Sequence, residues 1–233
     1  MTPPAASDPR GSLLTASRSG LYLITDTSII RGLSLQEAVQ KAILGGLKFL
    51  QYREKDLSPS VSYDIAKEQR RLTQDAGVTF VVNDNVSLAL AVKADGVHLG
   101  QEDLPIREAR KILGNQKLIG ISTHSVQEAV TAEKDGADYI GLGPIYPTTT
   151  KRTRPPLGCG IISEVKEKVR IPIFAIGGIN LDNLKEVMEA GATGVAAISA
   201  ILASPDITQT TRIFLETIAS VKMPHRSETE GNY

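Results

Sequence analysis

A single parallel (β/α)8 barrel is the fold class predicted by this sequence of 233 residues. A segment with helical periodicity followed by a short apolar strand recurs eight times between residues 19 and 222. Regular alternation of strands and helices favours a parallel sheet, and eight units in about 200 residues favour a closed barrel. The strands are uniformly apolar, as expected when both faces of a sheet are covered. A doubly wound open sheet is the alternative, but no Gly-x-Gly-x-x-Gly motif follows the first strand.

The first four units have clear starts and stops. Strands are predicted at 20–26, 46–50, 78–82 and 96–100. Ser34 with Glu37 forms a capping-box pattern for a helix over 35–43, and the glycines at 45 and 46 end that helix. Ser58 or Ser60 opens the second helix, which runs to about Ala76, and a short third helix is expected at 87–93.

The last four units repeat the pattern. Strands are predicted at 118–122, 137–142, 172–176 and 194–198, and helices at 105–113, 125–135, 161–169, 182–190 and 207–221. Ser125 is the expected cap of its helix, and Ser199 is the expected cap of a short additional helix after the last strand. Glycine leads from helix to strand at Gly96, Gly136 and Gly191.

Composition narrows the functional classes. The 26 basic and 26 acidic residues give zero net charge, so no overall field favours nucleic acid or an anionic membrane. One cysteine allows no internal disulfide, and no apolar run approaches the ~20 residues of a membrane span. We therefore expect a cytoplasmic enzyme, with homo-oligomerisation left open. Residues 1–18 are expected to be a disordered leader, 19–222 the catalytic barrel and 223–233 a disordered tail.

The most unusual stretch follows the second strand, where an apolar run ends in Gln51-Tyr52-Arg53-Glu54-Lys55. Side chains alternate along a strand, so Gln51, Arg53 and Lys55 should share one face. Two cations and an amide at a strand end suit a planar, phosphorylated substrate. The alternative interpretation is a strand that runs into a solvated loop.

Two acids on neighbouring strands indicate a magnesium site. Asp84 ends the third strand and Asp103 follows the fourth. The active sites of barrel enzymes lie at the carboxyl ends of the strands, and two carboxylates suit Mg2+, which keeps several waters and shares phosphate oxygens. The magnesium ion and the positive charges of Arg53, Lys55 and Lys151 would require a highly charged anion, such as a diphosphate, to balance them. The alternative is that both acids cap the helices that follow them.

The remaining strand ends add polar groups and a phosphate-type site. Ser122 and His124 follow the fifth strand, and the long loop at 144–156, expected to be a lid, carries Thr148, Thr149, Thr150 and Lys151. Gly177-Gly178 and Ser199 end strands seven and eight, where this fold commonly binds phosphate. An ordinary glycine turn is the alternative. His98 is expected to be a hydrogen-bonded structural residue, and the role of His124 stays open.

These motifs together resemble the thiamine phosphate synthase family. The motifs that carry the resemblance are Gln51–Lys55, Val82-Asn83-Asp84, Gly100-Gln101-Glu102-Asp103, Gly141–Lys151 and Ile176-Gly177-Gly178-Ile179, within about residues 22–220. The resemblance implies a barrel enzyme that joins 4-amino-5-hydroxymethyl-2-methylpyrimidine diphosphate to a thiazole phosphate and releases diphosphate. One departure is Asn85, where many members carry a second acid.

The resemblance also implies roles for individual residues. Pyrimidine diphosphate would be contacted by Gln51, Arg53, Lys55, Asn83, Ser122 and Lys151, of which Arg53, Lys55 and Lys151 are the predicted catalytic residues. Thiazole phosphate would be held by Thr148, Thr150, Gly178, Ile198 and Ser199. Tyr52, Glu54 and Thr149, which lie inside the motifs, are counted as substrate-binding. Mg2+ would be the cofactor, bound by Asp84 and Asp103.

Three other functions remain open from the sequence. A thiazole tautomerase would handle only the thiazole phosphate and could use His124 for proton transfer. A Schiff-base aldolase could use Lys55 or Lys151, whose pKa neighbouring cations would lower. A non-catalytic barrel that binds ligands is the third. The tautomerase would not need the whole set Arg53, Lys55, Asn83, Asp84, Asp103 and Lys151, whereas the aldolase stays open to a test by borohydride trapping with a sugar phosphate.

Overall fold

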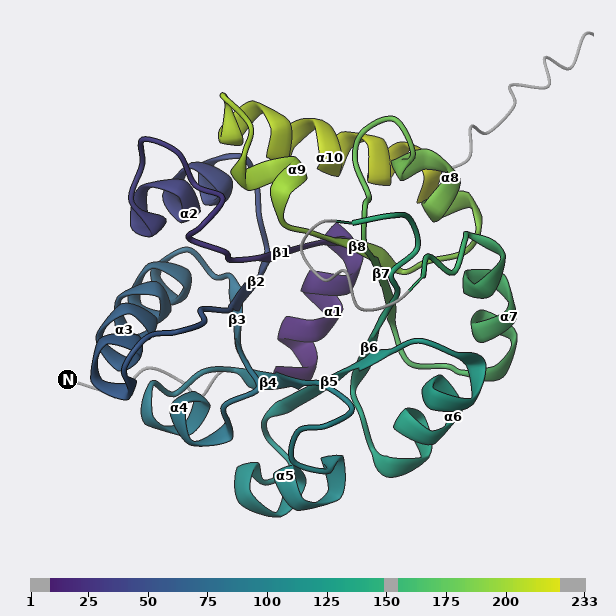
Figure 1. Cartoon of the computed structure of the whole chain (residues 1–233), viewed down its shortest axis with the longest axis horizontal. Coiled ribbons are helices and arrows are strands. Elements are labelled where there is room, and N and C mark those ends of the chain that lie inside the picture. Colours follow the sequence, from purple (N-terminus) through teal and green to yellow (C-terminus); the bar gives the residue numbers. More distant parts are fainter. Residues whose placement is uncertain (1–8, 149–154, 223–233) are drawn as a thin grey trace, which may run out of the picture.

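The structure, a computed structural model, describes residues 9–148 and 155–222. Eight parallel strands close into a barrel in sequence order, with β8 beside β1, which confirms the predicted fold class. The strands are β1 (Leu21–Ile24), β2 (Phe49–Tyr52), β3 (Thr79–Asn83), β4 (Gly96–Leu99), β5 (Leu118–Thr123), β6 (Tyr139–Leu142), β7 (Ile173–Ile176) and β8 (Gly194–Ala197). In Figure 1 the helices that follow the strands form a ring outside them.

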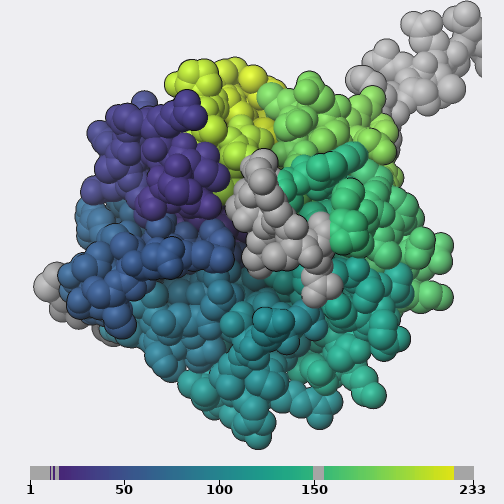
Figure 2. All heavy atoms as spheres, in the orientation of Figure 1, coloured from purple at the N-terminus to yellow at the C-terminus, as the bar shows by residue number. Residues whose placement is uncertain are grey.

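The helices begin largely where their capping residues predict. They are α2 (Leu35–Leu44), α3 (Pro59–Asp75), α4 (Val86–Ala91), α5 (Ile106–Leu113), α6 (Val126–Asp135), α7 (Gly160–Lys168), α8 (Leu184–Glu189), α9 (Ser199–Leu202) and α10 (Ile207–Lys222). Ser34 and Glu37 form the predicted capping box, and Ser58 and Ser125 cap α3 and α6. Figure 2 shows the successive units following one another around one face of the molecule.

One predicted helix is confirmed with shifted bounds, and one predicted helix cap is wrong. The third predicted helix, at 87–93, begins one residue earlier and ends at Ala91. Ser199 does not cap α9: the helix begins at Ser199, Ile198 holds the capping position, and no side chain accepts a bond there. The backbone of Ile198, with φ of −124° and ψ of −87°, enters the helix directly from β8.

The predicted leader is also wrong in part, because residues 9–18 belong to a helix, α1 (Pro9–Ser19). In Figure 1 α1 lies across the centre of the ring of strands, and Ala16 is fully buried. Ala16 and Leu13 pack against the aromatic residues inside the barrel, and Lys222 Nζ donates to the carbonyls of Ser17 and Arg18. Tertiary packing thus stabilises a helix whose own composition is weakly apolar. Residues 1–8 and the predicted tail at 223–233 lie outside the described residues.

The barrel interior is separate from the larger core between the strands and the helices. Leu, Ile, Val and Ala dominate the outer core. The interior layer is aromatic: Tyr22 stacks on Phe49 with ring centroids 3.9 Å apart, and Tyr139 and Phe174 meet Tyr22 edge to face. Such pairs contribute about 0.5–1.5 kcal/mol each beyond area burial. This layer forms the floor of the cavity described below.

None of the described helices is both long and apolar enough to cross a membrane.

Candidate active site

A cavity of about 450 Å³ opens at the carboxyl ends of the strands. Residues of most strands and of the loops that follow them line it. The members of the predicted substrate-binding set among them are Gln51, Arg53, Asn83, Ser122, Thr148, Gly178, Ile198 and Ser199. One side is formed by the side chains of Gln51, Arg53, Asn83 and Ser122, which we call the side-chain wall. The other, formed by Gly177, Gly178, Ile198 and Ser199, we call the backbone wall.

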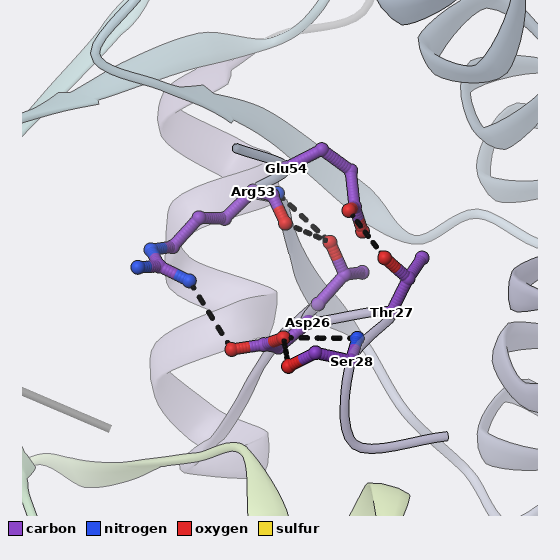
Figure 3. Close-up of polar contacts among 6 residues, drawn as sticks. Asp26, Thr27, Ser28, Arg53 and Glu54 are labelled. Carbon is purple, nitrogen blue, oxygen red and sulfur yellow. Dashed lines mark hydrogen bonds and ion pairs between the residues drawn. The ribbon is translucent and has the colours of Figure 1, made fainter. Parts of the chain in front are cut away.

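Arg53 is a nearly buried cation that is held by contacts with residues at the end of β1. Its side chain is 10% exposed, and its Nη1 lies 3.4 Å from Oδ2 of Asp26. The Thr25 hydroxyl accepts from the Arg53 backbone nitrogen at 2.8 Å and donates to the Arg53 carbonyl at 3.0 Å. Figure 3 shows these contacts between the ends of β1 and β2. The backbone clamp and the ion pair fix the guanidinium in the cavity, where an anionic substrate group would meet little competing water.

Tyr52 and Glu54 do not lie in the same cavity as Gln51 and Arg53. The Tyr52 hydroxyl lies 3.3 Å from the Ser62 hydroxyl of α3, and the Thr27 hydroxyl donates to Glu54 at 2.6 Å. Both residues line a second pocket of about 390 Å³ beside α3 and α4. Burial raises the pKa of Glu54. They do not reach the main cavity because side chains alternate along the strand.

Lys55 is exposed and is not among the residues that line the cavity. The predicted alternation of Gln51, Arg53 and Lys55 assumed an extended chain, but β2 ends at Tyr52 and Asp56 has a positive φ of 64°. The structure therefore brings Gln51 and Arg53 together and leaves Lys55 at the rim.

A line of hydrogen bonds crosses the cavity floor. Gln51 Nε2 donates to the Tyr22 hydroxyl at 2.6 Å, which lies 2.9 Å from the Tyr139 hydroxyl. That hydroxyl lies 3.2 Å from His98 Nδ1, and His98 Nε2 lies 3.1 Å from Ser122 Oγ. Complete burial raises the pKa of both tyrosines well above the ordinary value. His98 is thus hydrogen-bonded as predicted, and it also faces the cavity.

Asp84 and Asp103 are both anchored at the end of β4. The Asp84 backbone nitrogen donates to the carbonyl of His98 at 2.8 Å, and Oδ2 of Asp103 accepts from the Gly100 nitrogen at 2.6 Å. Residues two apart on a strand are about 7 Å apart, so the two acids lie on the same rim. Neither lines the main cavity, and Asp84 is exposed.

Helix capping does not explain either acid. Asn85 caps α4 through its side-chain oxygen, and Pro105 holds the capping position of α5 without a side-chain bond. Asp84 also has φ of 60°, in the left-handed region that residues other than glycine adopt uncommonly, aspartate and asparagine most often among them. Among the described residues no cluster of three or more His, Cys, Asp or Glu side chains could hold a metal. A site for Mg2+ would therefore use these two carboxylates, water and substrate oxygens.

Close packing of two loops shapes the backbone wall. Gly177 and Gly178 have φ of 100° and 64°. A Cβ on Gly177 would come within 2.6 Å of Pro144, and one on Gly178 within 2.5 Å of the Pro147 carbonyl. Both positions therefore require glycine. The exposed Ser199, at the start of α9, completes this wall.

The loop after β6 contributes only part of its predicted set. Thr148 lines the cavity. Thr149, Thr150 and Lys151, and with them most of the predicted lid, lie outside the described residues. His124 lines the cavity too, with its Nδ1 2.9 Å from Oε2 of Glu128.

Sequence reasoning missed several groups that hold the site. Asp26 could have been found, because it ends the first strand as Asp84 ends the third. Tyr22 and Tyr139 carried a weaker signal, as polar aromatic residues inside otherwise apolar strands. The contact between their hydroxyls joins β1 to β6. The two residues are 117 positions apart in the sequence, so only the closed barrel brings them together.

The fold and the cavity together define a (β/α)8 barrel enzyme with its active site at the carboxyl ends of the strands. Residues 21–201 match the sequence pattern of the thiamine monophosphate synthase family. The chain belongs to this family.

Curated relatives and a solved structure agree with this membership. The chain is 50% identical over 188 residues to the thiamine-phosphate synthase of Clostridium novyi, covering 80% of this chain and 92% of the relative. The thiamine-phosphate synthase of Methanospirillum hungatei is 48% identical over 198 residues, covering 84% and 96%. The structure of thiamine phosphate pyrophosphorylase from Pyrococcus furiosus superposes with a TM-score of 0.81 at 38% identity, covering 88% and 98%.

Proposed function

We propose that this chain is a thiamine-phosphate synthase, a transferase that joins the aminopyrimidine diphosphate to the thiazole phosphate. The observation that carries the proposal is one cavity with two unlike walls. The side-chain wall offers a buried guanidinium, two amides and a hydroxyl. The backbone wall offers two glycines with positive φ and an exposed serine. This division suits two substrates that each bear phosphate, one of which also carries a ring that forms hydrogen bonds.

The reaction we infer is dissociative. The bond between the benzylic-type carbon and the diphosphate oxygen breaks first, and the bonding electrons leave with diphosphate. The thiazole nitrogen then attacks the pyrimidine cation. That nitrogen has no proton to lose, so the step requires no general base. Arg53 is preorganised by Asp26 and Thr25 to stabilise the departing negative charge. Lys55 and Lys151 complete the proposed set of catalytic cations.

A magnesium ion fits the two acids at the end of β4. Asp84 carries its carboxylate at a position with a left-handed backbone, and Asp103 has one oxygen already oriented by Gly100. Residues in sparsely populated backbone conformations are common at functional sites. When bound, Mg2+ would neutralise charge on the diphosphate. The proposal includes Asp84 and Asp103 as its protein ligands.

Coupling of the two precursors tests the proposal. We expect thiamine phosphate to form with Mg2+ and not with a chelator. Asp84→Ala should abolish magnesium-dependent turnover while its thermal unfolding stays close to wild type. Asp64→Ala, an exposed acid on α3, is the matched control and should retain activity. Product formation that does not change across a magnesium titration would contradict the metal assignment, and absence of product would contradict the function.

An isomerase that acts on thiazole phosphate alone is the second candidate. The observation that favours it is His124 in the cavity with its ring nitrogen on Glu128, a pair suited to proton transfer. Incubation of the thiazole phosphate alone in deuterated water separates the two functions. The synthase proposal predicts no enzyme-dependent deuterium incorporation. Incorporation that His124→Asn abolishes would favour the isomerase.

We further propose that the enzyme works in the cytoplasm, supported by its single cysteine and neutral net charge.

A further inference from the structure

The line of hydrogen bonds on the cavity floor joins two side chains that face the substrate. Its ends are Gln51 on β2 and Ser122 on β5, and its middle is formed by Tyr22, Tyr139 and His98. We call these five residues the floor relay. Both tyrosines are at most 1% exposed, so water does not compete for their hydroxyls.

The relay can point in only two directions. A tyrosine hydroxyl has one proton, and leaving a buried hydroxyl proton without an acceptor is costly. Among the described residues, the Tyr22 hydroxyl meets only Gln51 and Tyr139, and the Tyr139 hydroxyl meets only Tyr22 and His98. If one bond reverses, each following bond must reverse as well.

The orientation of the Gln51 amide selects the direction. Because Gln51 Nε2 donates to Tyr22, the Tyr22 proton goes to Tyr139 and the Tyr139 proton to His98 Nδ1. His98 then carries its own proton on Nε2 and donates it to Ser122 Oγ. The Ser122 proton is left to point elsewhere, and the Gln51 amide oxygen is left to accept.

We propose that the floor relay fixes the hydrogen-bonding polarity of the cavity, with Gln51 presenting an acceptor and Ser122 a donor, and thereby selects an aminopyrimidine edge. An amino group donates and the adjacent ring nitrogen accepts, which matches this pair. A 4-oxo pyrimidine has the reverse pattern, since its carbonyl accepts and its ring N–H donates. The identity of the ring rests on the proposed function, whereas the polarity of the relay does not.

A glycine on β5 makes the relay sterically feasible. Gly120 pairs in register with His98 on β4 and with Tyr139 on β6. A Cβ on Gly120 would lie 2.1 Å from Cζ of Tyr139, so only glycine lets that ring cross β5. The Tyr139 hydroxyl then meets His98 on the far side. Tyr22, Tyr139 and His98 are positioning residues, because they act through Gln51 and Ser122.

The tautomer of His98 reports the polarity directly. Long-range proton–nitrogen correlation NMR on protein labelled at histidine distinguishes a ring nitrogen that carries a proton from one that does not. The three histidines are assigned by comparison with His98→Asn. We expect the His98 proton on Nε2. A proton on Nδ1 would overturn the proposal, and this result requires no substrate.

Ligand discrimination tests the consequence. Calorimetry should show that wild-type protein binds the 4-amino pyrimidine diphosphate about 100-fold more tightly than its 4-oxo analogue. Tyr22→Phe releases the Gln51 amide and should reduce that ratio to about 10-fold or less, with His98 still protonated on Nε2. Tyr63→Phe, on α3 and outside the cavity, is the matched control and should keep the wild-type ratio.

Two outcomes of the calorimetry contradict different claims. An unchanged ratio in a folded Tyr22→Phe variant overturns the selecting role of the relay. Failure of wild-type protein to bind either pyrimidine overturns that role and the proposed function together. The His98 tautomer still decides whether the relay has the inferred direction.

Discussion

The two walls of the cavity are built on opposite principles. The side-chain wall depends on hydrogen bonds and one ion pair that reach it from β1, β4 and β6. The backbone wall depends on how closely Gly177 and Gly178 approach the loop after β6. We therefore expect the side-chain wall to distinguish one planar ring from another, and the backbone wall to accept any small anion that fits. Variants should therefore fail in different ways on the two walls.

The largest effect is expected from Arg53, which is the only cation of the side-chain wall among the described residues. Arg53→Ala should lower kcat about 1000-fold, since it removes a preorganised charge from the departing anion. Single-turnover kinetics with both precursors measure the loss. Arg107→Ala, whose side chain is 65% exposed, removes a surface pair with Asp135 and should leave kcat unchanged. Equal activity of the two variants would contradict the role of Arg53.

On the backbone wall the main loss should be of stability. Gly177→Ala adds a Cβ against Pro144 in a left-handed conformation and should lower the free energy of unfolding by about 3 kcal/mol. Gly136→Ala has a similar φ of 95° but no atom within 4 Å of the added Cβ. It should cost only about 1 kcal/mol. Denaturant unfolding of both variants isolates the cost of the clash, and equal losses would show that the approach to Pro144 is not tight.

The two buried tyrosines of the cavity floor predict that the free energy of unfolding depends on pH in the alkaline range. Burial raises the pKa of Tyr22 and Tyr139 above about 10, the ordinary value. Above that pH the native state holds protons that the unfolded state has lost, so the free energy of unfolding falls as pH rises. Each tyrosine should contribute up to about 1.4 kcal/mol per pH unit, and nothing below pH 10.

Urea unfolding between pH 8 and 11 measures this slope. Replacing both tyrosines by phenylalanine should flatten it, while Tyr63→Phe should not. A slope that survives in the double variant would show that other groups cause the alkaline loss.

The smallest effect is expected at Ser199. Ser199→Asp places a negative charge beside the proposed phosphate and should weaken binding of thiazole phosphate about tenfold. Ser199→Asn is similar in size but uncharged and should bind within about twofold of wild type. Isothermal titration measures both affinities, and equal weakening would indicate a steric cause.

The barrel scaffold could be predicted from the sequence because one rule, the regular alternation of strands and helices, accounts for it. Eight repeats of strand and helix require a closed parallel barrel, and the strand-end rule then places Gln51, Arg53, Ser122 and Ser199 around one cavity. The rule failed for Lys55 because it assumed that β2 continues beyond Tyr52.

Features that depend on tertiary contacts could not be predicted. Helix α1 has little periodicity of its own and forms against the aromatic floor, where Ala16 is buried. The relay joins residues from β1, β2, β4, β5 and β6. Its bonds follow from the register of those strands and from the missing side chain at Gly120. No local pattern encodes such a register.

Separate titration of the two substrates tests the central claim, which is that each wall binds one of them. The experiment measures the affinities of aminopyrimidine diphosphate and thiazole phosphate for wild type, Gln51→Ala and Ser199→Asp. We expect that Gln51→Ala weakens binding of the pyrimidine alone and that Ser199→Asp weakens binding of the thiazole phosphate alone. If either variant weakens both ligands equally, or if the two effects are exchanged, the division of the cavity into two walls is contradicted.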